Sequence, residues 1–502
     1  DSKHSDNPIC LTYDMVGKLD TIALARPTTL EKKKRIAALL SAIISLHTKT
    51  AQASIAAVLS GITALIAIRW RRLAKLPRFG GEEAVTAPSG TLTAYETGKQ
   101  LVMGFARWHF RWTSAHIPGE QIQKWESMGD KRGDAVFSVA AASEDVAVSA
   151  ETFLEQIRAD KTAQVDPMPD WMDDALLQDG CDFFVSIWPL LFLAFSWALI
   201  GGFGCESAAA VLVESRYWAA QGIHGERDTF QRLQETVAWL FDMCAHGSES
   251  FKPGGTSWHA ALHVRWLHGR TRATVAKKEK WDGHKHGVPI NQAQMIGTLL
   301  GCSVLLLQGM EKSIGARFSD RDREAFIHLW RVIGHLFGIE HDLNPNKSYA
   351  GSKIAMESVF SFAIPERPSP ENAGLLTSHI CQSIARGFQE QYGVPVKKEH
   401  LAARANLFLG SPYGAALGLP AVALKHKILA WMSVAVQRAM FLPYVYLNFQ
   451  KIRKFYKMFF RSCFARTVRI LQQHHDKHGK TCRFGYLGDS SLCPMMSAKI
   501  AG

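Results

Sequence analysis

Three basic side chains in the run VRWLHGRTR, residues 264–272, have the types and the spacing to bind an anionic metal cofactor. If the run is helical, Arg265, His268 and Arg272 lie at positions i, i+3 and i+7 and therefore on one face of the helix. A neutral imidazole is an iron ligand, and guanidinium groups pair with carboxylates such as the two propionates of heme. The alternative interpretation is a solvated or ion-paired helix face without a cofactor.

A second arrangement of histidines precedes this run. HAALH, residues 259–263, places His259 and His263 at i and i+4, and His268 follows five residues later. Such spacing also suits zinc or non-heme iron, so a histidine-bound metal site is an alternative to heme. No glutamate follows His259, and the sequence lacks the HExxH, GxGxxG, GxSxG and P-loop motifs. These absences argue against HExxH metalloproteases, Rossmann dehydrogenases, serine hydrolases and phosphoryl-transfer enzymes.

Short motifs on both sides of VRWLHGRTR follow one another in a recognisable order. They include RLQET (232–236), KPGGTSW (252–258), GVPINQ (287–292), HLWRVIGHLFGIEHDL (328–343) and FLGSPYGAALGLP (408–420). This series resembles the catalytic domain shared by latex-clearing rubber oxygenases and the endoplasmic-reticulum-bound oxygenases of the mycophenolic acid pathway type. The resemblance extends over about residues 180–420. Each motif is short, but the whole series in the same order is hard to obtain by chance.

The resemblance implies a b-type heme held by the 264–272 run. His268 would be its axial metal ligand, with a neighbouring acceptor fixing the other ring nitrogen. Arg265 and Arg272 would pair with the propionates or with the rim of the site. The implied reaction is oxidative cleavage of a carbon–carbon double bond by dioxygen, in an isoprenoid or another apolar small molecule.

Further catalytic residues are implied upstream. Arg232 and Thr236, at i and i+4, match positions close to the heme in rubber oxygenases, where a cation and a hydroxyl would orient dioxygen. Glu235 stands where that branch tends to carry a lysine, and Glu214 is the candidate for the glutamate proposed there as a base. This departure weakens the case for polyisoprene as the substrate more than the case for heme. A scaffold or binding protein that kept the fold and lost the cofactor is a third interpretation.

The periodicity of apolar residues predicts an all-α fold. Apolar positions recur at intervals of three and four, for example in residues 325–337 and 427–442, and strand patterns are scarce. We therefore expect one large helical heme-binding domain with an N-terminal membrane anchor helix. Its predicted parts are a polar and basic segment (1–50), a transmembrane anchor (51–69), the oxygenase domain (95–445) and a basic C-terminal helix and tail (446–502).

The anchor prediction rests on residues 51–68, which carry no charge and are followed at once by four basic residues between 69 and 75. Such a flank stays in the cytosol, so we expect a protein of an intracellular membrane, with its catalytic domain facing the cytosol. The resemblance points to the endoplasmic reticulum. Residues 182–204 are still more apolar, but they run into the family-like region, so we expect them to be buried beside the cofactor. The basic, aromatic run 451–469 suits either anionic lipid or docking on its own domain.

The composition limits the remaining partners. The chain has 502 residues, 47% of them hydrophobic, and a net charge of +13, but no recognisable nucleic-acid-binding module. Its nine cysteines form no CxxC pair, which favours a reducing compartment. We expect an apolar substrate, dioxygen and membrane lipid as partners, and no nucleic acid. The sequence does not indicate an oligomeric state.

Overall fold

The computed structural model describes most of the chain from Val85 onward. The described residues are 85–86, 94–103, 108–135, 168–218, 222–313, 316, 318–364, 370–393, 395–447 and 458–459. All of them belong to one compact unit, Glu82–Gly502, and a second unit, Asp1–Gly81, lies outside the described residues. The predicted anchor, the predicted N-terminal segment and nearly all of the predicted C-terminal helix and tail are therefore not described.

The described residues begin with a small sheet. Its strands are β1 (Val85–Thr86), β2 (Gln100–Met103) and β3 (Trp108–Arg111), in the order β1-β2-β3. β1 pairs parallel to β2, and β2 pairs antiparallel to β3 with Leu101 opposite Phe110. These two side chains are buried and continue the helical core. The sheet is a correction to the all-α prediction, because four-residue strands are too short to show a clear alternating pattern.

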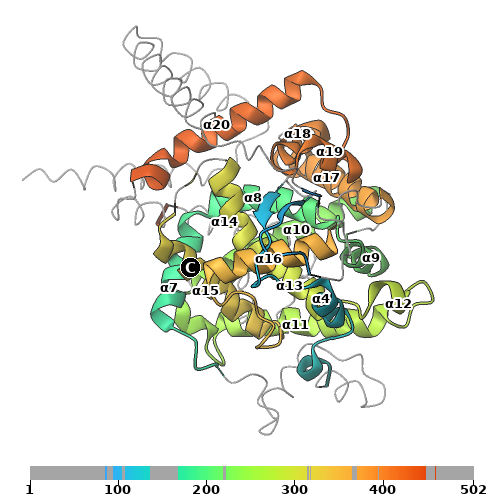
Figure 1. The fold of residues 1–502 in the computed structure, drawn as a ribbon. Coiled ribbons are helices and arrows are strands. Elements are labelled where there is room, and N and C mark those ends of the chain that lie inside the picture. Colours follow the sequence, from blue (N-terminus) through green and yellow to red (C-terminus); the bar gives the residue numbers. More distant parts are fainter. Residues whose placement is uncertain are drawn as a thin grey trace, which may run out of the picture. The chain divides into compact units, whose positions relative to one another are not determined.

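The rest of the described chain is helical, as predicted (Figure 1). In chain order the helices are α4 (Gly119–Glu126), α7 (Asp174–Ser186), α8 (Trp188–Gly202), α9 (Glu206–Glu214), α10 (Gly222–Ala245), the 3-10 helix η2 (Ser248–Phe251), α11 (Thr256–Val275), α12 (Gly283–His286), α13 (Gln292–Cys302), α14 (Val304–Ser313), α15 (Asp320–Leu336), α16 (Tyr349–Ala363), α17 (Pro370–Tyr392), α18 (Lys398–Leu409), α19 (Ser411–Ala416) and α20 (Leu424–Leu447).

Helices α7 and α15 form the closest helix pair of the core. α15 starts at a capping box, in which the Ser319 hydroxyl accepts from the Asp322 amide and the Asp322 carboxylate accepts from the Ser319 amide. A β-carbon at Gly180 of α7 would collide with the backbone carbonyl of Ala325. The glycine therefore lets the two helix backbones approach at this level. α15 also contacts α11, so this pair supports the helix that carries His268.

Residues 182–204 lie in the protein core, as expected. Ile187 separates α7 from α8, and Pro189 stands in the first turn of α8, where its missing N–H has no helical partner to lose. Phe184 and Leu191 are fully buried. Only one helical run among the described residues, Gln292–Glu311, is long and apolar enough to cross a membrane, and 78% of it is buried in the protein. The bent pair Ala194–Gly202 and Glu206–Glu214 would be a second if it is counted as one span.

Candidate functional site

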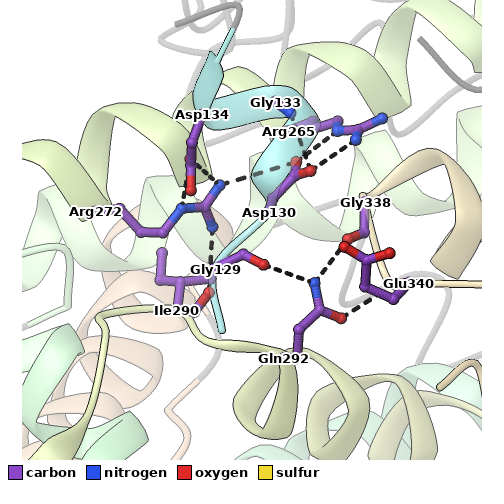
Figure 2. Close-up of polar contacts among 10 residues, drawn as sticks. All are labelled: Gly129, Asp130, Gly133, Asp134, Arg265, Arg272, Ile290, Gln292, Gly338 and Glu340. Carbon is purple, nitrogen blue, oxygen red and sulfur yellow. Dashed lines mark hydrogen bonds and ion pairs between the residues drawn. The ribbon is translucent and has the colours of Figure 1, made fainter. Parts of the chain in front are cut away.

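The residues 264–272 form part of α11, as predicted, and the two arginines of the predicted site are ion-paired. Arg265 donates from Nε to Asp130 Oδ2 (2.6 Å) and from Nη2 to Asp130 Oδ1 (2.7 Å). Arg272 donates from Nε to Asp134 Oδ1 at 2.7 Å, and its Nη2 lies 3.9 Å from Asp130 Oδ2. Figure 2 shows both aspartates on one short segment facing α11.

Asp130 is the centre of this network. It is 2% exposed, and its Oδ1 also accepts the Gly133 amide at 3.0 Å. Burial alone would raise the pKa of Asp130, but Arg265, the Gly133 amide and Arg272 together hold it below its usual value. A β-carbon on Gly338, which has φ +84°, would overlap the Asp130 carboxylate. The carboxylate thus stays charged in the core because every side of it is satisfied or closely packed.

The GVPINQ motif fixes the same segment from the other side. Gln292 Nε2 donates to the carbonyls of Gly129 (3.0 Å) and Gly338 (2.9 Å), and its Oε1 accepts the Glu340 amide at 3.1 Å. Ile290 adopts φ 51°, which is strained for a β-branched residue, and its carbonyl accepts from Arg272 Nη1 at 3.2 Å. One amide side chain therefore ties three segments together, and Figure 2 shows this clamp beside the ion pairs.

The ion-paired interpretation therefore describes both arginines in this structure. Two of the five N–H groups of Arg265 are used by Asp130, and Nε of Arg272 is used by Asp134. The predicted pairing of Arg265 and Arg272 with heme propionates stays a prediction. The observed role of the pair is to fix the orientation of α11 on each side of His268.

His268 lies one turn from each of these arginines and has a different environment. Its Nδ1 is buried, and neither ring nitrogen forms a hydrogen bond to any residue that the structure describes. Burial, with a smaller contribution from Arg272, lowers the pKa of His268 to about 3. The ring meets Phe337 edge-on at 6.0 Å between centroids. His268 is therefore a neutral imidazole whose nitrogens are unused, which is the state a metal ligand needs.

Phe337 connects His268 to the predicted catalytic face of α10. It stacks on Trp239 with a centroid separation of 5.9 Å. Trp239 lies seven residues after Arg232 and three after Thr236, so the three share one helix face. Trp239 Nε1 is buried without a hydrogen bond to any described residue. The Trp239 end of the α10 face and His268 therefore both contact Phe337.

Arg232 and Thr236 both contact Tyr217, a residue that sequence reasoning missed. Arg232 Nη1 donates to the carbonyls of Arg216 and Tyr217, and its guanidinium lies 4.9 Å from the Tyr217 ring centroid. Thr236 hydrogen-bonds to the Tyr217 hydroxyl and donates to the Arg232 carbonyl at 2.8 Å. Burial raises the pKa of Tyr217 to about 12. Arg232 therefore stabilises the turn before α10, where Arg216 has φ 55°.

The two glutamates have separate surroundings. Glu214, at the end of α9, pairs with Lys278, whose Nζ lies 3.7 Å from Oε2 and also donates to the Glu214 carbonyl. Glu235 is 3% exposed and its Oε1 accepts from Gln231 at 2.9 Å. Neither carboxylate forms a hydrogen bond or an ion pair with His268 within the described residues. The assignment of Glu214 as a base stays a prediction.

The HAALH histidines lie inside α11. His259 and His263 are 4% and 3% exposed, and their rings pack against Trp258 and Trp266. Burial lowers the pKa of His263 to about 4. Within the described part of the chain, no three His, Cys, Asp or Glu side chains are placed to hold a metal ion together. The described geometry offers no observation in favour of the histidine-bound non-heme site.

Comparison with known proteins identifies the domain that contains this site. The family model described as "ER-bound oxygenase mpaB/B'/Rubber oxygenase, catalytic domain" matches residues 187–438, half of the chain. The chain belongs to this family. The match includes every predicted site residue from Arg232 to Arg272 and confirms the resemblance read from the motifs. Asp130 and Asp134 lie before the matched region.

A relative and a solved structure of the same family accompany this match. The chain is 23% identical over 268 residues to "Rubber oxygenase" of Streptomyces sp. (strain K30). That match covers 52% of this chain and 60% of the relative's length. A solved structure titled "Structure of Latex Clearing Protein LCP in the closed state" is 19% identical, with a TM-score of 0.47, over 67% of this chain and 90% of that one.

Asp130, Asp134 and Gln292 are the residues of this network that the sequence did not reveal. The segment MGDKRGD, residues 128–134, reads as a polar, glycine-containing loop, and nothing in it points to a partner 135 residues later. Gln292 is part of a motif that carried the family resemblance, but the motif gave no hint of its three backbone partners. These contacts form only when the 128–134 segment packs against α11 and against the start of α13.

We expect Asp130→Asn to destabilise the oxygenase domain by about 3–5 kcal/mol, because Arg265 would keep a buried charge without a countercharge. The pKa of Asp130 is lower in the folded state than in the unfolded state. The Asp130 carboxylate therefore adds to the free energy of unfolding at pH values above its unfolded-state pKa, and this stabilisation is lost as the pH falls through its folded-state pKa. Urea unfolding at several pH values measures both effects. Asp320→Ala is the control, because this 95% exposed partner of Arg323 should contribute at most about 1 kcal/mol. Equal losses of unfolding free energy in the two variants would show that the buried ion pair contributes no more to stability than the exposed one.

Proposed function

We propose that this protein is a heme-dependent oxygenase that uses dioxygen to cleave a carbon–carbon double bond in an isoprenoid or another apolar substrate. Membership of the oxygenase family supports the reaction class. The observation that carries the cofactor assignment is His268, a neutral imidazole inside the family domain with neither ring nitrogen engaged by a described residue. A buried nitrogen without a partner is costly unless a ligand uses it.

The residues around His268 fit a heme in two respects. His268 Nδ1 and Trp239 Nε1 are buried and form no hydrogen bond to a described residue. The rings of both residues contact Phe337, so one side of His268 is aromatic, which suits a porphyrin ring. His268 would hold the metal. The arginines on either side would keep α11 in place rather than bind the propionates, since Asp130 and Asp134 already engage them.

When bound, the heme would supply the activation of dioxygen. The protein's own contribution would be to position and exclude water. Thr236 presents a hydroxyl and Arg232 a cation on the α10 face that Trp239 continues toward Phe337. The Tyr217 phenol, kept neutral by a pKa of about 12, holds Thr236 and stacks on Arg232. A cation that is fixed in this way loses little energy in reorganising when charge develops nearby.

We propose an apolar substrate because the family's rubber-oxygenase branch is named for one and because α8 is apolar. The buried run of α8 packs Trp197 onto Phe408 of α18, with ring centroids 3.5 Å apart. We further propose that the protein resides on an intracellular membrane, the endoplasmic reticulum, with the oxygenase domain in the cytosol. The support is the uncharged run 51–68 and its basic flank.

His268→Ala should abolish heme binding. Loss of the metal ligand should cost more affinity than the roughly 10- to 100-fold typical of changes in the second shell. The measurement is heme content from the Soret absorption of purified protein, where the parent should carry about one heme b per chain. His263→Ala on the same helix is the matched control and should keep its heme. A parent protein without a Soret band but with stoichiometric zinc would overturn the assignment.

Thr236→Val should keep the heme and lose most turnover, by about 10²-fold or more, because it conserves shape but removes a hydroxyl that would turn its proton from the Arg232 carbonyl toward developing charge. Arg232→Ala should lose turnover as well, and its melting temperature should fall because the 216–217 turn loses its support. Turnover of an isoprenoid alkene, normalised to heme content, measures the first effect and thermal melts measure the second. If the Thr236→Val protein works at the parent rate, the hydroxyl has no part in the reaction.

The full chain should need detergent for extraction, whereas a chain that begins at Leu76 should be largely soluble, because it lacks the uncharged run. Carbonate extraction of membranes, followed by detection of the protein in pellet and supernatant, measures the difference. Identical partitioning of the two chains would show that residues 51–68 do not anchor the protein.

A further inference from the structure

Helix α20 buries a partly polar face and exposes an apolar one. Its inner face carries His426 and Ala430, both buried, and its Ser433 accepts from Arg404 Nη1 of α18 at 2.6 Å. Gln437, one turn further, accepts from Arg404 Nη2 at 3.4 Å. α20 therefore packs on α18 through a polar seam, along the edge of the helical domain (Figure 1).

The outward face of α20 is made of large apolar side chains. Leu424, Ile428, Trp431, Met432 and Val436 are between 50% and 71% exposed, and we call this set the α20 face. Their spacing of three and four residues makes one continuous stripe. A surface helix of a water-soluble domain normally has the opposite arrangement, with the apolar stripe inside. An apolar stripe of this size facing outward marks an interaction surface.

The charged residues around the α20 face are positive. Lys425 and Lys427 are both exposed beside the stripe. The sequence from residue 400 to residue 475 contains eleven lysines and arginines and no aspartate or glutamate. A stripe that combines tryptophan and aliphatic residues with flanking lysines has the chemistry of a membrane interface with anionic headgroups.

We propose that the α20 face lies on the surface of a bilayer that contains anionic lipid, with Trp431 and Met432 among the upper acyl chains and the two lysines at the headgroups. A second copy of this chain would bring the same positive charge against itself. Residues 51–68 are an unfavourable occupant for the same reason, because Arg69, Arg71 and Arg72 follow them directly. Charge complementarity therefore selects lipid among the available occupants.

This contact is separate from heme binding and from the predicted anchor. The purpose of this contact rests on the proposed function. The contact would bring the oxygenase domain against the bilayer, into which an apolar alkene partitions. The domain would then meet its substrate at the bilayer surface.

The test is hydroxyl-radical footprinting of the full chain, with peptide mass spectrometry at Trp431 and Met432. The chain is compared free of lipid, on vesicles of phosphatidylcholine, and on vesicles with 30 mol% phosphatidylserine, a composition on the order of an anionic cytoplasmic surface. We expect oxidation of both residues to slow several-fold on the anionic vesicles and much less on the neutral ones. Ile223 of α10 and Leu375 of α17, also exposed apolar residues, are internal controls whose labelling should change little.

The charge dependence is tested with Lys425→Glu and Lys427→Glu combined. A lysine near an anionic surface contributes about fivefold in affinity, so the double variant should lose the protection at Met432 on anionic vesicles. Lys277→Glu with Lys280→Glu, two exposed lysines after α11, is the matched control and should retain it. The Soret band of each variant reports heme separately, and carbonate extraction reports the anchor. Failure of either of those proposals is thereby distinguished from failure of this one.

Three results would overturn the proposal. Equal labelling of Met432 with and without anionic vesicles would show that lipid does not cover the α20 face. Protection without lipid that is independent of protein concentration would identify a segment of the chain itself as the occupant. Protection without lipid that grows with protein concentration would identify a second copy.

Discussion

The structure depends on a buried charge pair between residues that lie 135 positions apart in the sequence. Asp130 holds Arg265 in two short hydrogen bonds, and Arg272 approaches from the next turns of α11. A buried carboxylate is stable only when its charge and its lone pairs are satisfied, and here a guanidinium, a backbone amide and a second arginine do so. The cost of misplacing any of them fixes α11 relative to the preceding segment. It thereby fixes the depth and direction of His268.

The same constraint separates the tasks of the three basic residues on α11. The two arginines hold α11 through ion pairs. His268 between them is neutral, and it forms no hydrogen bond to a described residue. Burial disfavours the imidazolium, and the neighbouring Arg272 adds to this effect. An imidazole that stays neutral near pH 7 keeps a nitrogen available to a metal. The ion pairs thus hold the helix that carries His268 in place.

The family motifs have structural roles that cannot be read from their sequences. GVPINQ supplies the Gln292 clamp and the strained Ile290, and RLQET supplies the arginine that supports the turn at Arg216 and Tyr217. Both motifs are pinned to segments with unusual backbone angles. Such angles persist only where the surroundings over-determine them, and they are common near functional sites. α20, which packs on α18, exposes its apolar face and buries a partly polar one, unlike a typical surface helix of a soluble protein.

The sequence by itself determined the helical class, the family and the identity of His268 as the residue to examine. Helical periodicity and the order of short motifs are local properties, so they can be read without knowing which helices touch. The sequence also placed residues 182–204 correctly in the core. It missed the small sheet, because strands of four residues carry too little pattern.

Only the tertiary structure decided what the two arginines do. Their spacing on α11 is equally compatible with propionates and with carboxylates, and the partners Asp130 and Asp134 lie in a loop with no recognisable signature. The position of Tyr217 beneath Arg232 and Thr236, and the outward direction of the apolar stripe on α20, were undecided for the same reason. A helical pattern shows that one face is apolar, but which face is buried is settled by the neighbour it packs against, and that neighbour is set by contacts between residues far apart in the chain.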